Sequence, residues 1–222
     1  MPSSMPLGRI PRRLLVHHLP MGMLTIASAT LLYATKVFPE PLERMSFASA
    51  YPALILISLT LLIGPLKLLN RNRVPVSIDL RRDIGIWAGM TGLFHAGVGQ
   101  FVHQRGRPWL YYVFEEWPRP FPIRYDVFGI ANYTGLFATF ILLMLLATSN
   151  DASLRKLRGP GWKGLQRWNY ACFGLAAIHT LLYQVVLESQ AAPFVATALF
   201  AIVVTALVQW RGYKLRQSRA AA

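Results

Sequence analysis

The sequence predicts an all-α integral membrane protein, a six-transmembrane-helix bundle with both termini in the cytoplasm. Of the 222 residues, 54% are hydrophobic and only 14% are charged, whereas about a quarter of the residues in an average soluble domain are charged. The apolar residues form blocks close to the roughly 20 residues that span a bilayer. Lysine and arginine also concentrate in alternate connections between these blocks. We therefore expect one membrane domain over residues 1–222.

Six apolar blocks are expected to form the spans. The fourth, "VFGIANYTGLFATFILLMLLAT", and the sixth contain no charged residue and are the clearest. The first is the weakest, because His17, His18 and Lys36 interrupt it near its ends. No A-x-A-like cleavage site follows it, so a retained helix is expected rather than a signal peptide. The predicted spans are residues 15–38, 47–69, 84–103, 127–148, 169–187 and 193–210.

The net charge of +14 is best explained by membrane orientation. Basic residues gather before the first span, between the second and third, between the fourth and fifth, and after the sixth, while the other connections hold few. This is the positive-inside pattern, and such residues also meet anionic lipid. It places both termini in the cytoplasm and argues against a nucleic-acid-binding role. The second connection holds Lys67, Arg71, Arg73, Arg81 and Arg82, and the fourth holds Arg155, Lys156, Arg158, Lys163 and Arg167.

Two histidines inside apolar spans are the main candidates for a functional site. His95 lies in "GLFHAGVGQ" and His179 in "GLAAIHTLLYQ", about 12 and 10 residues into the third and fifth spans, or roughly 18 and 15 Å deep. Both spans run outward from the cytoplasm, so the imidazoles should lie at similar depth. Polar groups inside a membrane tend to mark function, and imidazole is a good iron ligand. The alternative is two unrelated histidines hydrogen-bonded across helices.

A haem with two imidazole ligands fits these residues better than a zinc site. No cysteine or acidic residue lies at zinc-ligand spacing from His95. Gly92, Gly97 and Gly99 would let a flat macrocycle or a neighbouring helix approach closely. The single cysteine, Cys172, lies within the fifth span and is interpreted as a small buried apolar residue.

The stretches "DLRRDIGIWAGMTGLFHAGVG" and "LRKLRGPGWKGLQRWNYACFGLAAIHTLLY" resemble the ferric reductase-like transmembrane domain. The resemblance covers residues 47–210 and is greatest to the haem-binding membrane subunits of bacterial methionine sulfoxide reductase systems. It implies a multi-pass protein of the bacterial inner membrane that binds haem b and transfers electrons to an acceptor outside the cytoplasm. In those systems the acceptor is a periplasmic molybdenum enzyme.

The sequence departs from this superfamily at one expected site. Its members commonly carry histidine pairs on helices three and five, which hold two stacked haems. Here Arg81 stands 14 residues before His95, and Gln166 stands 13 residues before His179. Neither is a suitable iron ligand, so one haem is expected, with two as the alternative. Arg81 and Gln166 are instead candidates for binding haem propionates, a quinone head group or an FMN phosphate, although Arg81 is also explained as a topology charge.

Three further features complete the set of candidates. His103 follows His95 by two helical turns, and is either an interfacial residue or one that binds a second cofactor, relays a proton or contacts a partner. His17 and His18 are interpreted as interfacial. The aromatic-rich connection 104–126 is either an interfacial lid or a docking surface that covers a cofactor.

The expected function is electron transfer by a subunit of an oxidoreductase rather than by a complete enzyme. The sequence contains no glycine-rich phosphate loop, no G-x-S-x-G motif and no flavin or nicotinamide domain after the sixth span. Electrons should come from quinol or from a soluble flavin reductase and reach a periplasmic redox partner protein, for example a methionine sulfoxide reductase. The alternative is a non-redox membrane scaffold, a small transporter or an accessory subunit that has lost its haem.

Overall fold

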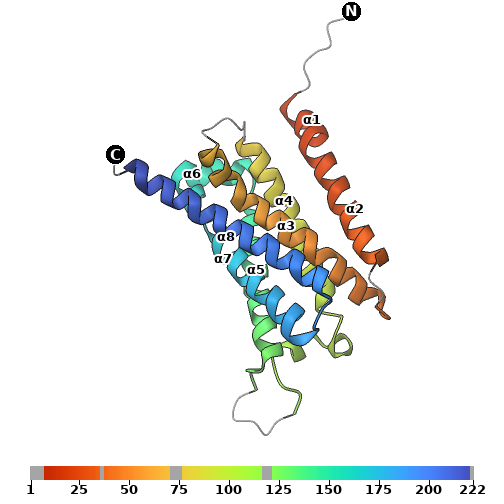
Figure 1. Ribbon diagram of the computed structural model, residues 1–222. Coiled ribbons are helices and arrows are strands. Elements are labelled where there is room, and N and C mark those ends of the chain that lie inside the picture. Colours follow the sequence, from red (N-terminus) through yellow and green to blue (C-terminus); the bar gives the residue numbers. More distant parts are fainter. Residues whose placement is uncertain (1–7, 36–37, 71–76, 117–121, 221–222) are drawn as a thin grey trace, which may run out of the picture.

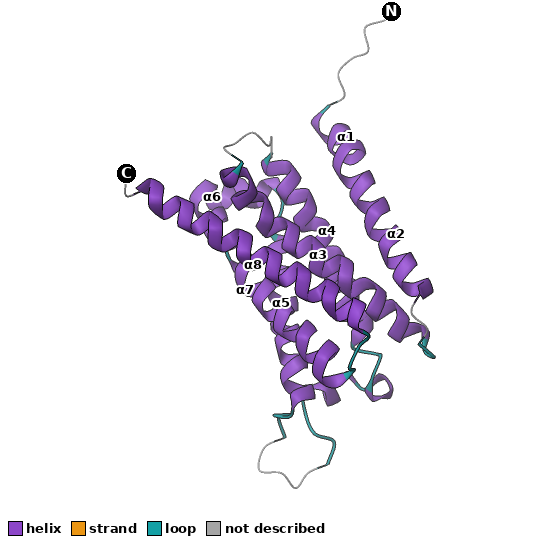
Figure 2. Cartoon of the chain, viewed as in Figure 1, coloured by secondary structure: helices purple, strands orange, loops and turns teal. Residues whose placement is uncertain are grey.

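The computed structural model describes residues 8–35, 38–70, 77–116 and 122–220, and these residues form a bundle of long helices (Figure 1). Helices dominate the fold, and short loops join them (Figure 2). The end of the bundle that carries α6 is called here the α6 end, and the opposite end, which includes residues 100–116 and 122–126, the loop end. The elements are α1 (Arg9–Arg13), the π-helical η1 (Leu14–His18), α2 (Leu19–Thr35), α3 (Pro41–Leu69), α4 (Ile78–Gly99), α5 (Val127–Ala147), α6 (Asp151–Gln166), α7 (Trp168–Leu181), the π-helical η4 (Leu182–Leu187) and α8 (Ala192–Ala220).

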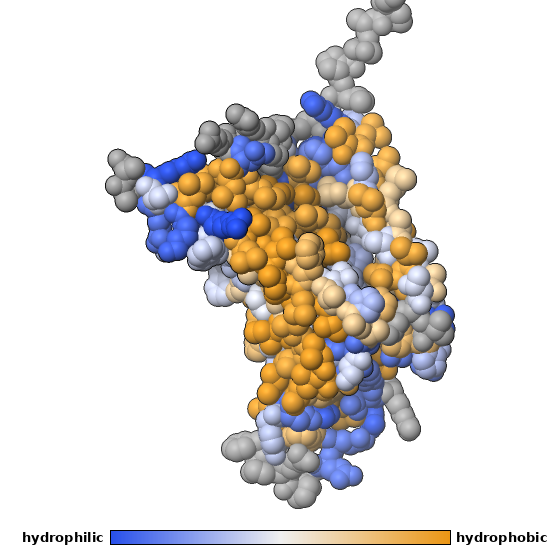
Figure 3. Space-filling model, in the orientation of Figure 1, coloured by the Kyte–Doolittle hydropathy of each residue, from blue (hydrophilic) through white to orange (hydrophobic). Residues whose placement is uncertain are grey.

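Within the described ranges, five helical stretches are long and apolar enough to cross a membrane. An apolar surface covers the middle of the face shown in Figure 3, with hydrophilic residues toward both ends. The all-helical membrane fold is therefore confirmed, whereas the count of six rests on α4. That helix is of spanning length, but it has four charged residues near its start, several glycines and His95, which lower its hydropathy. The five stretches are Ile10–Thr35, Pro41–Leu69, Val127–Ala147, Asp151–Leu187 and Ala192–Ala220.

The helix bounds differ from those expected at several places. Helix α4, which corresponds to the third predicted span, begins at Ile78 and ends at Gly99, so His103 lies beyond it. Helix α8, the sixth predicted span, continues to Ala220. Helix α6 lies between the fourth and fifth predicted spans, in a segment that was expected to be a loop. Asn150 caps it by accepting a hydrogen bond from the Ser153 backbone N–H at 2.8 Å. Lys36, Arg71, Arg73 and Arg119 lie outside the described residues.

Helix α3 lies at the centre of the bundle, where it packs against α4 on one side and α8 on the other. A Cβ atom added at Gly212 of α8 would lie 2.8 Å from the side chain of Pro65, so the two helices are in close contact there. Proline has no backbone N–H, and the carbonyl of Leu61, four residues earlier, therefore lacks its helical partner. The Gln209 side chain of α8 donates a hydrogen bond to that carbonyl at 2.6 Å.

The first helix docks on the bundle through Asp83, which is completely buried. Its carboxylate accepts hydrogen bonds from the Arg13 guanidinium, with Nε at 3.2 Å, and lies 2.7 Å from Nδ1 of His17. Nε2 of His18 lies 3.2 Å away. The two histidines expected at the interface thus share a buried carboxylate with Arg13. Sequence spacing could not show this, because His17 and Asp83 are 66 residues apart.

Candidate functional site

A cavity of about 530 Å³ lies between α3, α4, α5 and α7 and extends to the loop end. Its volume is within the range of cofactor-binding pockets. Toward the α6 end its walls are apolar, and toward the loop end polar side chains lie among apolar ones such as Phe47 and Val102. The apolar wall includes Leu54, Ile57, Ala138, Leu142 and Cys172, and the polar wall includes Glu43, Gln100, His103, Gln184 and Glu188. No lysine or arginine is among the described residues that line it.

His95 of α4 and His179 of α7 both line this cavity. The two helices run in the same direction, from the α6 end to the loop end (Figure 1). The centres of the imidazole rings are 6.2 Å apart, and the ring planes meet at 73°. Two metal–imidazole bonds of about 2 Å plus the radius of each ring separate two ring centres by roughly 6 Å. The spacing is therefore suited to a metal ion held between the rings.

Backbone carbonyls fix the orientation of both imidazoles. Nδ1 of His95 lies 2.9 Å from the Ser46 carbonyl oxygen of α3, and Nδ1 of His179 lies 2.8 Å from the Ala131 carbonyl oxygen of α5. Because a carbonyl only accepts, Nδ1 must carry the proton in both rings, which leaves the Nε2 lone pair available. Metal-binding histidines commonly have this second contact. In the described part of the chain, neither Nε2 has a hydrogen-bond partner.

Glycines around the two histidines have separate roles. A Cβ atom at Gly135 of α5 would lie 2.8 Å from Nδ1 of His179, so only glycine leaves room for the ring. A Cβ atom at Gly92 would overlap the Leu142 side chain, so this glycine permits close packing of α4 against α5. At Gly97 a Cβ atom would have no neighbour within 4 Å, and this residue lines the cavity. At Gly99 it would meet only the Ser46 hydroxyl at 3.5 Å.

Aromatic side chains continue from His179 toward the loop end. The Tyr183 ring lies 4.9 Å from that of His179, and its hydroxyl donates a hydrogen bond to Asn132 at 2.9 Å. On its other side Tyr183 is nearly parallel to the His103 ring, with 6.2 Å between centres. His103 therefore lines the cavity beyond the end of α4, together with Tyr112 from the connection 104–126. Its place in the wall fits either a second contact for a cofactor or a packing residue.

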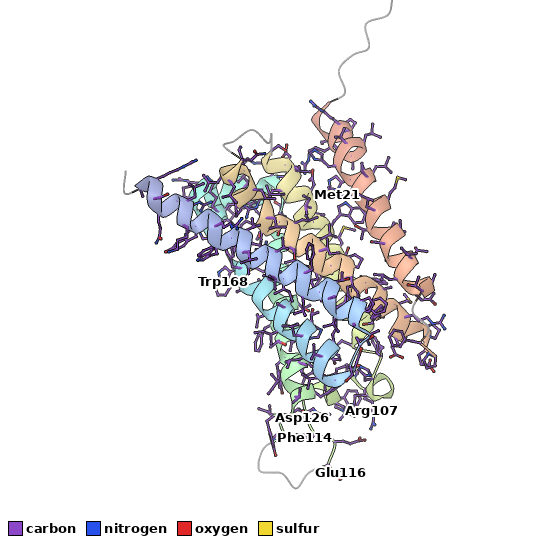
Figure 4. All side chains as sticks on the ribbon, in the orientation of Figure 1. Met21, Arg107, Phe114, Glu116, Asp126 and Trp168 are labelled. Carbon is purple, nitrogen blue, oxygen red and sulfur yellow. The ribbon has the colours of Figure 1, made fainter. Side chains whose placement is uncertain are left out.

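The described part of the connection 104–126 contributes to the cavity wall at the loop end through Tyr112. It contains two 3-10 turns, Gln104–Gly106 and Pro108–Tyr111, and an isolated bridge between Val113 and Ile123. Arg107, Phe114 and Asp126 lie together at this end of the molecule (Figure 4). Tyr112 is the described residue of this connection that lines the cavity, and residues 117–121 lie outside the described ranges. The choice between an interfacial lid and a docking surface stays a prediction.

Arg81 and Gln166 are not part of this cavity. Arg81 is exposed at the start of α4, and Gln166 ends α6. The Gln166 side-chain nitrogen is buried and has no hydrogen-bond partner among the described residues. A role for either residue in binding a quinone or a flavin stays a prediction, separate from the two histidines.

Several residues of the site had no signal in the sequence. Ser46 and Ala131 act through backbone carbonyls, which any residue supplies. Gly135 lies in a span without charge, and glycines are common in membrane helices. Tyr51 and Gln184, which line the cavity and are hydrogen-bonded to each other, are 133 residues apart.

Comparison with known proteins relates the chain to a haem-binding subunit. No protein-family model matches the chain. The chain is 31% identical over 179 residues to the protein-methionine-sulfoxide reductase heme-binding subunit MsrQ of Cronobacter sakazakii, and the alignment covers 80% of each protein. The aligned length is large enough to include most of the helices described above.

Proposed function

Because the chain belongs to the family of haem-binding subunits of protein-methionine-sulfoxide reductases, we propose that it binds one haem b between His95 and His179. In this proposal it carries electrons across the bacterial inner membrane to a periplasmic partner. The observation that supports it best is the pair of imidazoles 6.2 Å apart, each held through Nδ1 by a backbone carbonyl.

The residues of the cavity fit a haem. His95 and His179 would hold the iron through their Nε2 atoms. A bound haem supplies an iron that accepts and releases single electrons. The leucine, isoleucine and alanine side chains of the apolar wall exclude water from the ring, and the carbonyls of Ser46 and Ala131 increase the basicity of both imidazoles. An iron held by both imidazoles would be suited to electron transfer rather than to binding a substrate.

Orientation and partners complete the proposal. If α4 is counted together with the five other spans, the chain crosses the membrane six times. The α6 end and both termini then face the cytoplasm, where the basic residues of α6 and α8 meet anionic lipid. Electrons enter from quinol or from a soluble flavin reductase and leave at the loop end. The acceptor is a methionine sulfoxide reductase, as the name of the Cronobacter sakazakii relative suggests.

The ligand assignment is tested by replacing each histidine in turn. His95→Ala and His179→Ala each remove one iron–nitrogen bond, so each purified variant should lose the low-spin optical spectrum and most of its haem. His103→Ala is the matched control, because His103 lines the same cavity but is not proposed as a ligand, and it should retain both. A His179→Ala protein with full haem content and an unchanged low-spin spectrum would refute the assignment.

A further inference from the structure

We propose that Tyr51 of α3 and Gln184 of η4 bind the propionate edge of the haem, so that its carboxylates point toward the loop end. This inference rests on the proposed function, because it concerns the same cavity. It gives the haem one orientation and assigns a role to two buried polar residues that the iron does not need.

The first observation is a hydrogen-bonding pair that is incomplete. Tyr51 is 4% exposed and Gln184 is 8% exposed. The Gln184 side-chain nitrogen donates to the Tyr51 hydroxyl oxygen at 2.8 Å. The other amide atom, Oε1, is buried and has no partner among the described residues. A buried polar group without a partner costs free energy, and its presence in a cavity wall points to a ligand.

Either orientation of the amide leaves a donor for that ligand. As described above, the tyrosine hydroxyl accepts from Gln184, so its own proton is free to donate. If the amide is rotated by 180°, the hydroxyl donates to Oε1 and an amide N–H is free instead, which also removes the unpaired acceptor. The pair is therefore suited to a ligand that accepts hydrogen bonds, and a carboxylate is the strongest such acceptor.

The second observation is the difference in polarity between the two ends of the cavity. Haem b has an apolar ring and two carboxylates on one edge. Gln184 lies five residues beyond His179 toward the loop end, or roughly 7 Å along the helix, whereas Cys172 and Leu142 form an apolar wall on the other side. Burying a carboxylate against that wall would be costly.

Charge does not supply an alternative partner. No lysine or arginine is among the described lining residues, and Arg81 and Gln166 lie outside the lining. The two acidic residues of the wall, Glu43 and Glu188, are at the loop end. Glu188 is exposed and accepts a hydrogen bond from Gln190 at 2.6 Å, so solvent screens its charge. Among the neutral polar groups of the lining, which also include Gln100 and His103, Tyr51 and Gln184 form the buried pair that has an atom without a partner.

The test compares the affinity of the haem-free protein for haem b and for its dimethyl ester, in which both carboxylates are neutral. Tyr51→Phe should weaken haem b binding about tenfold, as expected for one hydrogen bond to a charged group, and should weaken ester binding less. Gln184→Glu places a negative charge beside the propionate, so it should weaken haem b by more than tenfold and leave the ester nearly unaffected. Tyr111→Phe is the matched control, because Tyr111 is equally buried, at 1% exposed, but does not line the cavity.

The outcomes separate this inference from the proposed function. If wild-type protein binds neither porphyrin, the haem-binding function itself is wrong. If wild-type protein binds both, and Tyr51→Phe and Gln184→Glu bind haem b as tightly as wild type or lose both porphyrins to the same extent, the function stands and the orientation is wrong.

Discussion

A methyl group at Gly135 of α5 would lie 2.8 Å from Nδ1 of His179 on α7, on the side of the ring that is bonded to the Ala131 carbonyl. Because Gly135 has no side chain, the imidazole on the other helix can pack directly against the backbone of α5. A carbonyl contact and a close glycine together leave the ring little freedom to rotate.

Gly135→Ala should therefore move the His179 ring away from the carbonyl and weaken haem binding. We expect haem content to fall several-fold with the helical circular dichroism unchanged. Gly174→Ala is the control, because a Cβ atom there would have no neighbour within 4 Å; it should retain full haem. Equal haem content in Gly135→Ala and wild type would show that this contact does not position the ligand.

Arg81→Ala and Gln166→Ala should leave a bound haem in place, since neither residue lines the cavity that contains both histidines. Haem content per chain and the low-spin spectrum of the purified variants are the measurements. Complete haem loss in both variants, with the fold intact, would indicate that the haem binds at the α6 end instead.

Asp83→Ala should destabilise the attachment of the first helix. The change leaves Arg13, His17 and His18 without their shared carboxylate, and removing one partner of a buried ion pair typically costs about 3–5 kcal/mol. Thermal unfolding in detergent should show a clearly lower midpoint. Glu115→Ala, which breaks the exposed pair with Arg107, should cost less than about 1 kcal/mol, and a similar loss in both variants would contradict the buried role of Asp83.

The start of α5 should show an acid-dependent stability. Asp126 accepts a hydrogen bond from the Gly129 N–H at 2.8 Å and pairs with Arg124 at 2.6 Å. The hydrogen bond from Arg124 lowers the pKa of this carboxyl below its usual 3.8. Its contribution is therefore fully present above pH 3.8, and it is lost as the pH falls through the lower pKa of the folded state. The difference in unfolding midpoint between wild type and Asp126→Asn should shrink below pH 3.8; a difference that stays constant would exclude the carboxylate as its source.

The proposed topology predicts that the two ends of the bundle react with cysteine reagents from opposite sides of the membrane. Cys172 is fully buried, so the native background should be low. Ser218→Cys, near the end of α8, should react only when a membrane-impermeant reagent has access to the cytoplasm. Glu116→Cys, at the loop end (Figure 4), should react from the periplasm. Labelling of Ser218→Cys from the periplasmic side would refute the arrangement.

Hydropathy and the distribution of basic residues predicted the helical membrane fold, because apolar blocks of about 20 residues match the thickness of a bilayer only as helices. The depths of His95 and His179 along parallel spans also predicted that their rings would lie at the same level. The sequence did not predict α6, because the five basic residues between the fourth and fifth predicted spans suggested a connection. The backbone is helical on both sides of a break at Arg158, where φ is 53°. The sequence also did not predict the contacts made by backbone carbonyls or by residues far apart in the chain, because composition and spacing do not show which residues meet in the folded protein.

The Gln209–Leu61 hydrogen bond has a consequence for biogenesis. The carbonyl freed by Pro65 lies in an apolar helix, where an unpaired polar group costs several kcal/mol, and its partner is synthesised 148 residues later. While the ribosome is still producing the intervening helices, α3 must be tolerated in the translocon or the bilayer with that carbonyl unsatisfied. Helix α3 forms part of the cavity wall, so we expect its final packing, and with it haem loading, to follow the insertion of α8.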